Sequence, residues 1–223
     1  MTWAVLVAAL ALASRAAAAP LVAPDVDRRV HVAAGVGHQW GVGGSAAAWG
    51  DSFTQRFELS GEAGRRARTA IGFALVHARP TLVDTRALIP EPGVPAGAAS
   101  GVRDELSCLF SVRVPLHVGA ILPAESPILE VLPTFGFTAG MLATDAHLVV
   151  AGYDAAVPVR SRTLAPVLGA RIGAELRLWD WLAVLPHGEL LATLAADARE
   201  VGSGQTWEAE ARLMIGADLA VRF

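Results

Sequence analysis

The residues best suited to chemistry in this sequence are His187 and Glu189, because imidazole and carboxylate groups bind metal ions and transfer protons. They are two residues apart in a stretch where apolar and polar residues alternate, so in a β-strand they would share one face. His117, from a similar stretch, could reach the same face and complete a metal site or a proton-transfer pair. Residues at this spacing are more often hydrogen-bonded neighbours with a structural role. We therefore expect no catalytic residue, no metal site and no cofactor.

The charged residues and the single cysteine exclude several classes of protein. All 18 cationic residues are arginines, and 21 acidic residues give a formal net charge of -3, so no basic surface is expected for nucleic acid. Cys108 alone forms neither an intramolecular disulfide nor a cysteine zinc site. The chain is 53% hydrophobic, yet beyond the N-terminus it has no run of about 18 apolar residues, the length of a membrane-spanning helix. The apolar residues must therefore lie in another kind of element.

The N-terminus has the pattern of a secretory signal peptide. Residues 3–13 form an apolar stretch, and Ala16, Ala17 and Ala18 are the small residues that a signal peptidase cleavage site needs. A buried helix is the alternative. We predict cleavage after Ala18, which leaves residues 19–223 as a single domain.

Alternation with a period of two runs through the mature chain and is clearest in residues 207–223. There the odd positions are all apolar, while the even positions include Glu208, Glu210 and Arg212. This apolar face is longer than the strands of about five or six residues that globular proteins use, and it fits a tilted membrane strand of about nine to eleven. The same alternation recurs in residues 30–37, 53–60, 68–75, 110–118, 130–141, 168–178 and 182–194. The sequence thus predicts eight strands.

The connections between these strands alternate in length. Short ones fall at residues 61–67, 120–127 and around Asp180, and long ones at residues 41–52, 79–105, 143–162 and 197–206. This pattern predicts an all-β fold, a transmembrane antiparallel up-and-down β-barrel of eight strands with both termini at one end. The β-prone run that contains Leu148, Val149 and Val150 could offer an edge to a partner, but a longer strand pair is the favoured interpretation.

One face of each strand would point to lipid and the other into the lumen. The alternative is a secreted, lipocalin-like barrel with an apolar interior. The polar faces favour the membrane barrel, because they mix charges with small residues such as Gly35, Gly72 and Gly173, which suit the crowded lumen of a narrow cylinder.

At this level the chain resembles the small eight-stranded outer-membrane barrels, the class of the OmpA membrane domain, OmpX and OmpW. The architecture carries the resemblance, together with an alternating apolar ladder that ends in a C-terminal phenylalanine and includes Leu213, Ile215, Leu219, Val221 and Phe223. The resemblance implies export to the outer membrane of a Gram-negative bacterium and contact with its lipid. It also implies that Leu219, Val221 and Phe223 are read by the barrel-assembly machinery.

The lumen would hold a nearly balanced set of charges. Its predicted members are Arg56, Glu58, Arg68, Arg113, Glu130, Arg171, Glu175, Arg177, Glu189, Glu208, Glu210, Arg212, Asp218 and Arg222. Balanced pairs in a narrow cylinder more often form a salt-bridged plug than a selectivity path. We therefore expect a non-enzymatic barrel with a structural or surface-interaction role. A narrow porin-like channel is the runner-up, and a lipid-modifying enzyme is third, since the His-x-Ser of the lipid A deacylases does not occur here.

Aromatic residues and prolines mark the predicted ends of the strands. Trp179, Trp181 and Phe223 would form an interfacial belt at one end, and Trp40, Trp49 and Trp207 another at the opposite end. Each strand proline removes one donor from a barrel that has no free edge. We expect Pro115, Pro133, Pro166 and Pro186 at bulges or strand ends.

Overall fold

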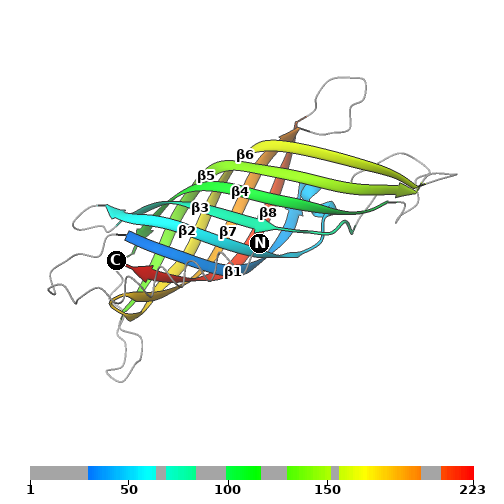
Figure 1. The fold of residues 1–223 in the computed structure, drawn as a ribbon. Coiled ribbons are helices and arrows are strands. Elements are labelled where there is room, and N and C mark those ends of the chain that lie inside the picture. Colours follow the sequence, from blue (N-terminus) through cyan, green and yellow to red (C-terminus); the bar gives the residue numbers. More distant parts are fainter. Residues whose placement is uncertain (1–29, 64–68, 84–98, 117–129, 152–155, 197–206) are drawn as a thin grey trace.

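A computed structural model of the chain describes residues 30–63, 69–83, 99–116, 130–151, 156–196 and 207–223. They form a closed antiparallel barrel in which each strand pairs with the next along the chain and β8 pairs with β1 (Figure 1). The predicted fold and the number of eight strands are confirmed. The strands are β1 (Val30–Gly43), β2 (Ser52–Ala63), β3 (Thr69–Ala78), β4 (Ala99–Pro115), β5 (Glu130–Ala151), β6 (Ala156–Trp179), β7 (Leu182–Ala196) and β8 (Trp207–Arg222). The predicted signal peptide lies outside the described residues.

The barrel closes where the chain's last residue meets the first described one. The Phe223 amide donates to the Val30 carbonyl at 2.9 Å, and the Val30 amide donates to the Phe223 carbonyl at 3.4 Å. From there the β1–β8 register runs from His31 opposite Arg222 to Gly43 opposite Ala211. Closure leaves no strand edge along the spanning part of the barrel, which is the condition for a sheet to lie in hydrocarbon.

The apolar residues face outward, as the alternation of the strands requires. In β3, Ile71, Phe73 and Leu75 are exposed while Ala70, Ala74 and Val76 are buried. The inward residues replace the core of a globular protein, so packing inside the lumen must hold the fold together.

The lengths of the connections differ from the prediction of strict alternation. Residues 143–162 are not a long connection, because β5 and β6 continue through them and leave only residues 152–155 between the strands. This agrees with the longer strand pair favoured from the β-prone run. Residues 79–105 are also partly strand, since β4 begins at Ala99, whereas the connection predicted at 120–127 extends over residues 116–129. The pairing of β4 with β5 up to Ala99 and Val150 explains the long strands, because each gives the other a ladder partner.

The strand prolines lie where a backbone donor is not needed. Pro115 is the last residue of β4, and Pro133 lies just beyond its end and accepts a hydrogen bond from the Leu116 amide at 2.7 Å. Pro166 directly precedes Val167, where the ladder between β6 and β7 begins. Pro186 lies in an interruption of that ladder, between the pairs Gly173–His187 and Leu176–Val184. Pro115 thus lies at a strand end as expected. Pro133, Pro166 and Pro186 lie inside β5, β6 and β7 and pair with Ala174, Met141 and Ala217, so the expectation of a bulge or strand end is wrong for these three.

One short helix, η1 (Gly44–Ala48), follows β1. No helix in the described ranges is both long and apolar enough to cross a membrane. η1 leads into Trp49, which is buried, so the interfacial position predicted for Trp49 is wrong. The Gly50 amide donates to the Thr81 carbonyl at 2.7 Å and the Val83 amide to the Ala48 carbonyl at 2.9 Å. These bonds hold the segment after β1 against the segment after β3 at the end of the barrel opposite Val30 and Phe223.

Candidate functional site

The middle of the lumen holds a central cluster of six charged side chains. Its members are Arg56, Glu58, Arg113, Arg171, Glu189 and Asp218, and all six are buried. Three arginines face three carboxylates, so the cluster is neutral. Inward positions of β2, β4, β6, β7 and β8 supply these residues, so only closure of the barrel brings them together.

Arg171 links two carboxylates of the central cluster. It donates to Glu58 at 2.9 Å and to Asp218 at 3.0 Å. Glu58 is fully buried and also accepts from Arg113 at 2.8 Å, and Arg56 donates to Glu189 at 2.8 Å. Buried charges are tolerated only when each finds partners, and here every member has at least one.

Glycines make room for these long side chains. A Cβ atom on Gly35 would lie 2.2 Å from Asp218 Oδ1 and 2.3 Å from the Ala217 carbonyl oxygen. A residue with a side chain at this position would collide with the neighbouring strand. Small residues on the inward faces are therefore needed where charged side chains of the neighbouring strand lie close to the backbone.

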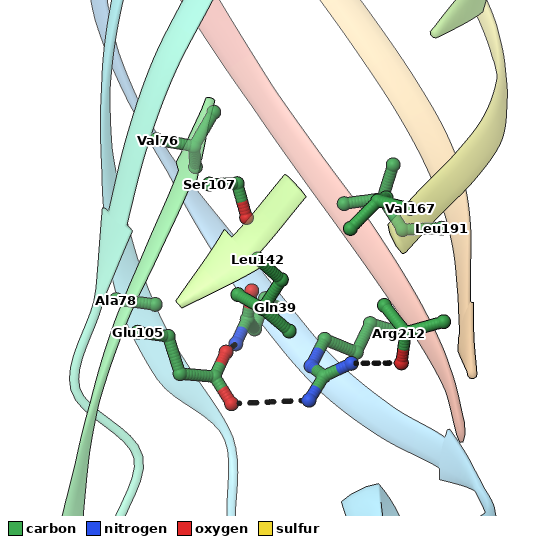
Figure 2. A pocket seen from close by; sticks show the side chains of 10 residues that line it. Gln39, Val76, Ala78, Glu105, Ser107, Leu142, Val167, Leu191 and Arg212 are labelled. Carbon is green, nitrogen blue, oxygen red and sulfur yellow. Dashed lines mark hydrogen bonds and ion pairs between the residues drawn. The ribbon is translucent and has the colours of Figure 1, made fainter. Parts of the chain in front are cut away.

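A second group, the upper cluster, lies toward the end of the barrel where η1 folds inward. It consists of Gln39, Arg103, Glu105, Glu210 and Arg212. Gln39 donates to Glu105 at 2.6 Å and Arg212 donates to Glu105 at 3.3 Å, as Figure 2 shows. Arg103 contacts Glu105 at 2.5 Å and Glu210 at 3.4 Å. The two arginines balance the two glutamates.

A third group, the lower cluster, lies at the end that carries Val30 and Phe223. Arg222 donates to Glu62 at 2.8 Å, and His31 lies 2.9 Å from the same Glu62 oxygen. Arg177 donates to Glu175 at 2.8 Å and also binds Glu130. Glu130 is more exposed than its partners, so this cluster reaches the mouth of the barrel.

Apolar layers separate the three charged clusters. Between the upper and central clusters lie Ala74, Val76, Leu109, Leu142, Val167, Leu191 and Met214, all buried and in mutual contact. A smaller layer of Ala33, Ala183, Leu185 and Ala220 separates the central and lower clusters. Along β8, the inward positions pass from Arg212 through Met214, Asp218 and Ala220 to Arg222, which is the same sequence of layers.

Little empty space remains in this stack. A cavity of about 10 Å³ lies beside the upper cluster, lined by Gln39, Glu105 and Arg212 on one side and by Leu142, Val167 and Leu191 on the other (Figure 2). That is room for about one water molecule. The inward side chains of the clusters and layers are almost all buried, so over the described residues they fill the lumen.

The two side chains singled out for chemistry bind different partners. His187 and Glu189 both point into the lumen. The hydrogen bond that was expected between them does not form. His187 Nδ1 lies 3.1 Å from the Leu185 carbonyl oxygen and 3.6 Å from Asp218, whereas Glu189 binds Arg56. His117 lies outside the described residues. Those that are described include no group of three or more His, Cys, Asp or Glu side chains placed to hold a metal ion.

The structure places most of the predicted lumen charges inside the barrel. The side chains of Arg68 and Glu208 lie outside the described set. The prediction missed Gln39, Arg103 and Glu105 of the upper cluster and His31 and Glu62 of the lower one. Alternation of Arg103, Glu105 and Ser107 with Val102, Leu106 and Cys108 could have identified the extension of β4.

Trp179, Trp181 and the predicted assembly residues lie on the outer face. Trp179 and Trp181 stack with ring centroids 5.8 Å apart, and both are exposed at the end that carries the exposed Phe223. Trp40 lies 4.6 Å from His38 at the other end. Leu219 is exposed and Val221 partly so on the same face as Phe223. The side chain of Trp207 lies outside the described set.

Comparison with known proteins gives information about the fold and about nothing else. No family model matches the chain, and no curated protein matches it in sequence. A major outer membrane protein from Thermus thermophilus has a similar structure, with a TM-score of 0.55 at 13% identity over 87% of this chain and 99% of that one. Neisserial surface protein A gives a TM-score of 0.48 at 14% identity, covering 87% of this chain and 97% of its own. The fold is that of the small eight-stranded outer-membrane β-barrels.

Proposed function

We propose that this protein is an integral outer-membrane barrel that acts as a closed structural or surface-interacting element and catalyses no reaction. The observation that carries the proposal is the layered filling of the lumen inside a barrel whose outer face is apolar. A barrel without an open lumen can interact only through its outer wall, which contacts lipid, and through its ends, which contact the medium outside the membrane.

The outer face supports a position in lipid. Large apolar side chains are exposed on all eight strands: Val36, Phe53, Phe73, Phe110, Phe137, Leu168, Ile172, Leu190 and Ile215 are examples, with exposed fractions from 40% to 80%. A surface of this kind would aggregate in water, whereas a closed barrel can bury it in hydrocarbon.

A narrow channel remains the second candidate. The apolar layers between the charged clusters argue against ion conduction. An ion that crosses the barrel would have to pass the layer around Leu109 and Met214, where apolar side chains are the majority and only neutral hydroxyls such as those of Ser107 and Thr193 lie beside them. Such a layer would replace little of the hydration shell of the ion. It would also have to break the Arg171 contacts in the central cluster. A lipid-modifying enzyme is the third candidate, which mass spectrometry of lipid A from cells with and without the protein would test.

Two partners follow from the proposal. The first is membrane lipid around the apolar band, and the second is the assembly machinery during biogenesis, which would read Leu219, Val221 and Phe223. A surface partner would meet the end opposite the termini, where β5 and β6 extend beyond the ladder between β6 and β7.

Migration on an unboiled gel tests the proposal. The folded protein, recovered from the outer-membrane fraction, should migrate differently before and after boiling, because closed barrels resist detergent. An epitope tag inserted within residues 152–155 should be detected on intact cells. A protein recovered in the soluble fraction, with no change on boiling, would overturn the proposal.

A further inference from the structure

The exposed arginines of the barrel lie together at one rim. Among the described residues, Arg79, Arg160 and Arg162 are exposed, and all the other arginines are buried in the lumen. The three exposed ones lie beyond β3 and on β6, at the end opposite the termini. With Asp104 of β4 and Asp145 of β5 they form an outward-facing rim patch across four neighbouring strands.

The aspartates of the rim patch hold the arginines in place. Arg160 donates to Asp145 through Nε at 2.8 Å and also through Nη2, and Arg162 donates to the same carboxylate through Nε at 3.1 Å. Arg79 Nε lies 3.3 Å from Asp104. The hydrogen bonds from Arg160 and Arg162 hold the pKa of Asp145 well below its usual range, so this carboxylate stays ionised.

Two of the arginines contact their aspartates through Nε and are largely exposed. Arg162 and Arg79 contact their aspartates through Nε, and their side chains are 66% and 65% exposed. A guanidinium group that contacts a carboxylate along its Nε edge still has N–H groups on its other edges that can donate to another group. Three arginines against two aspartates leave the rim patch with a net charge of +1, while His77 and His147 beside it add charge only if protonated.

The height of the rim patch on the barrel identifies its surroundings. On the outer face of β6, Leu164 is exposed two residues after Arg162, and on β4, Leu106 is exposed two residues after Asp104. Two residues of strand span about 7 Å. The rim patch thus begins next to the outward apolar residues of β4 and β6, which in the proposed membrane position would put it near the depth of lipid headgroups.

We propose that the rim patch binds the phosphate of a lipid headgroup, with Arg79 and Arg162 as the donors and Asp104 and Asp145 as the residues that position them. A guanidinium group matches phosphate because two of its N–H groups donate to two oxygens at once. Basic side chains beside a membrane also attract anionic headgroups without a defined geometry. The inference rests on the proposed position in the membrane.

Lipid selectivity at the protein surface tests this inference. The folded protein is placed in vesicles of phosphatidylcholine that contain traces of spin-labelled phosphatidic acid or spin-labelled phosphatidylcholine, and the relative association constant is measured. The unmodified protein should prefer phosphatidic acid, and R79Q/R162Q should lower this preference by about fivefold per arginine at low salt. R79K/R162K keeps the positive charges but loses the paired N–H donors of the guanidinium groups. Its preference for phosphatidic acid should lie between those of the unmodified protein and R79Q/R162Q.

The control is Trp181→Phe, which changes an exposed residue at the opposite rim without changing the charge and should leave the preference unchanged. An unmodified protein that folds into the vesicles but shows no preference, or an R79Q/R162Q variant that keeps the full preference, would overturn the lipid site and leave the membrane barrel intact. Failure of the unmodified protein to insert into vesicles would overturn both.

Discussion

The guanidinium group of Arg103 lies 4.7 Å from the centre of the Trp49 ring, inside the barrel. Trp49 belongs to a small apolar cap with Ala48 and Ala146, against which Leu82 and Leu148 pack. The upper cluster is therefore covered by the segment that follows η1. Trp49 and its cap therefore cover the upper cluster at the end of the lumen opposite Val30 and Phe223.

Replacing Trp49 by alanine should destabilise the barrel strongly. The change removes a buried aromatic side chain and its contact with a cation, so we expect a loss of about 3–5 kcal/mol in the free energy of unfolding. Urea unfolding in vesicles measures it. Trp181→Ala is the matched control, because that tryptophan is exposed on the outer face, and its loss should be smaller. Equal losses for both variants would contradict the cap.

The central cluster predicts a coupled pair of substitutions. Arg171→Leu leaves Asp218 without its closest partner, so the variant should lose about 3–5 kcal/mol of stability. The double variant R171L/D218L removes both charges and should recover part of that loss. If the double variant loses as much as the two single variants added together, the two side chains are not coupled.

Ile172 tests the two faces of one strand. Its side chain is 64% exposed, whereas the adjacent Arg171 is 2% exposed. Ile172→Arg should therefore cost up to about 2–4 kcal/mol if the site lies near the middle of the membrane. Ile172→Val is the control and should unfold almost as the unmodified protein does. Spin labels at positions 171 and 172 should differ in their accessibility to oxygen dissolved in lipid, and equal accessibility would refute the assignment of faces.

Phe223 tests assembly apart from stability. Its backbone closes the barrel through Val30, and a substitution keeps these bonds, so Phe223→Asp should refold in detergent micelles nearly as well as the unmodified protein. In cells the same variant should give less folded protein in the outer membrane. Unchanged levels of heat-modifiable protein in cells would remove the assembly role of this residue.

The faces of the strands could be predicted from the sequence because alternation is a local property. Arg171 and Ile172 fall on opposite faces in any straight strand. The lengths of β5 and β6 were harder to predict, because residues beyond the membrane need no apolar face. Asp145 and Arg162 are paired only through the register of the two strands.

The layers of the lumen depend on register around the whole barrel. Each apolar residue of the larger layer is adjacent to an exposed one, as in Leu109–Phe110, Leu142–Met141, Val167–Leu168, Leu191–Leu190 and Met214–Ile215. These doublets interrupt the alternation and are the signal that sequence reasoning missed. Trp49 carried no such signal, because a short connection that folds into a lumen has no periodicity.

Conductance across a planar bilayer tests the closed lumen most directly. With the protein inserted, and its insertion verified by heat-modifiable migration of the recovered material, we expect no sustained current above the bare bilayer, because the apolar layer around Leu109 and Met214 and the ion pairs of Arg171 fill the pore. A steady ohmic current through the unmodified protein would contradict a closed barrel and favour a channel.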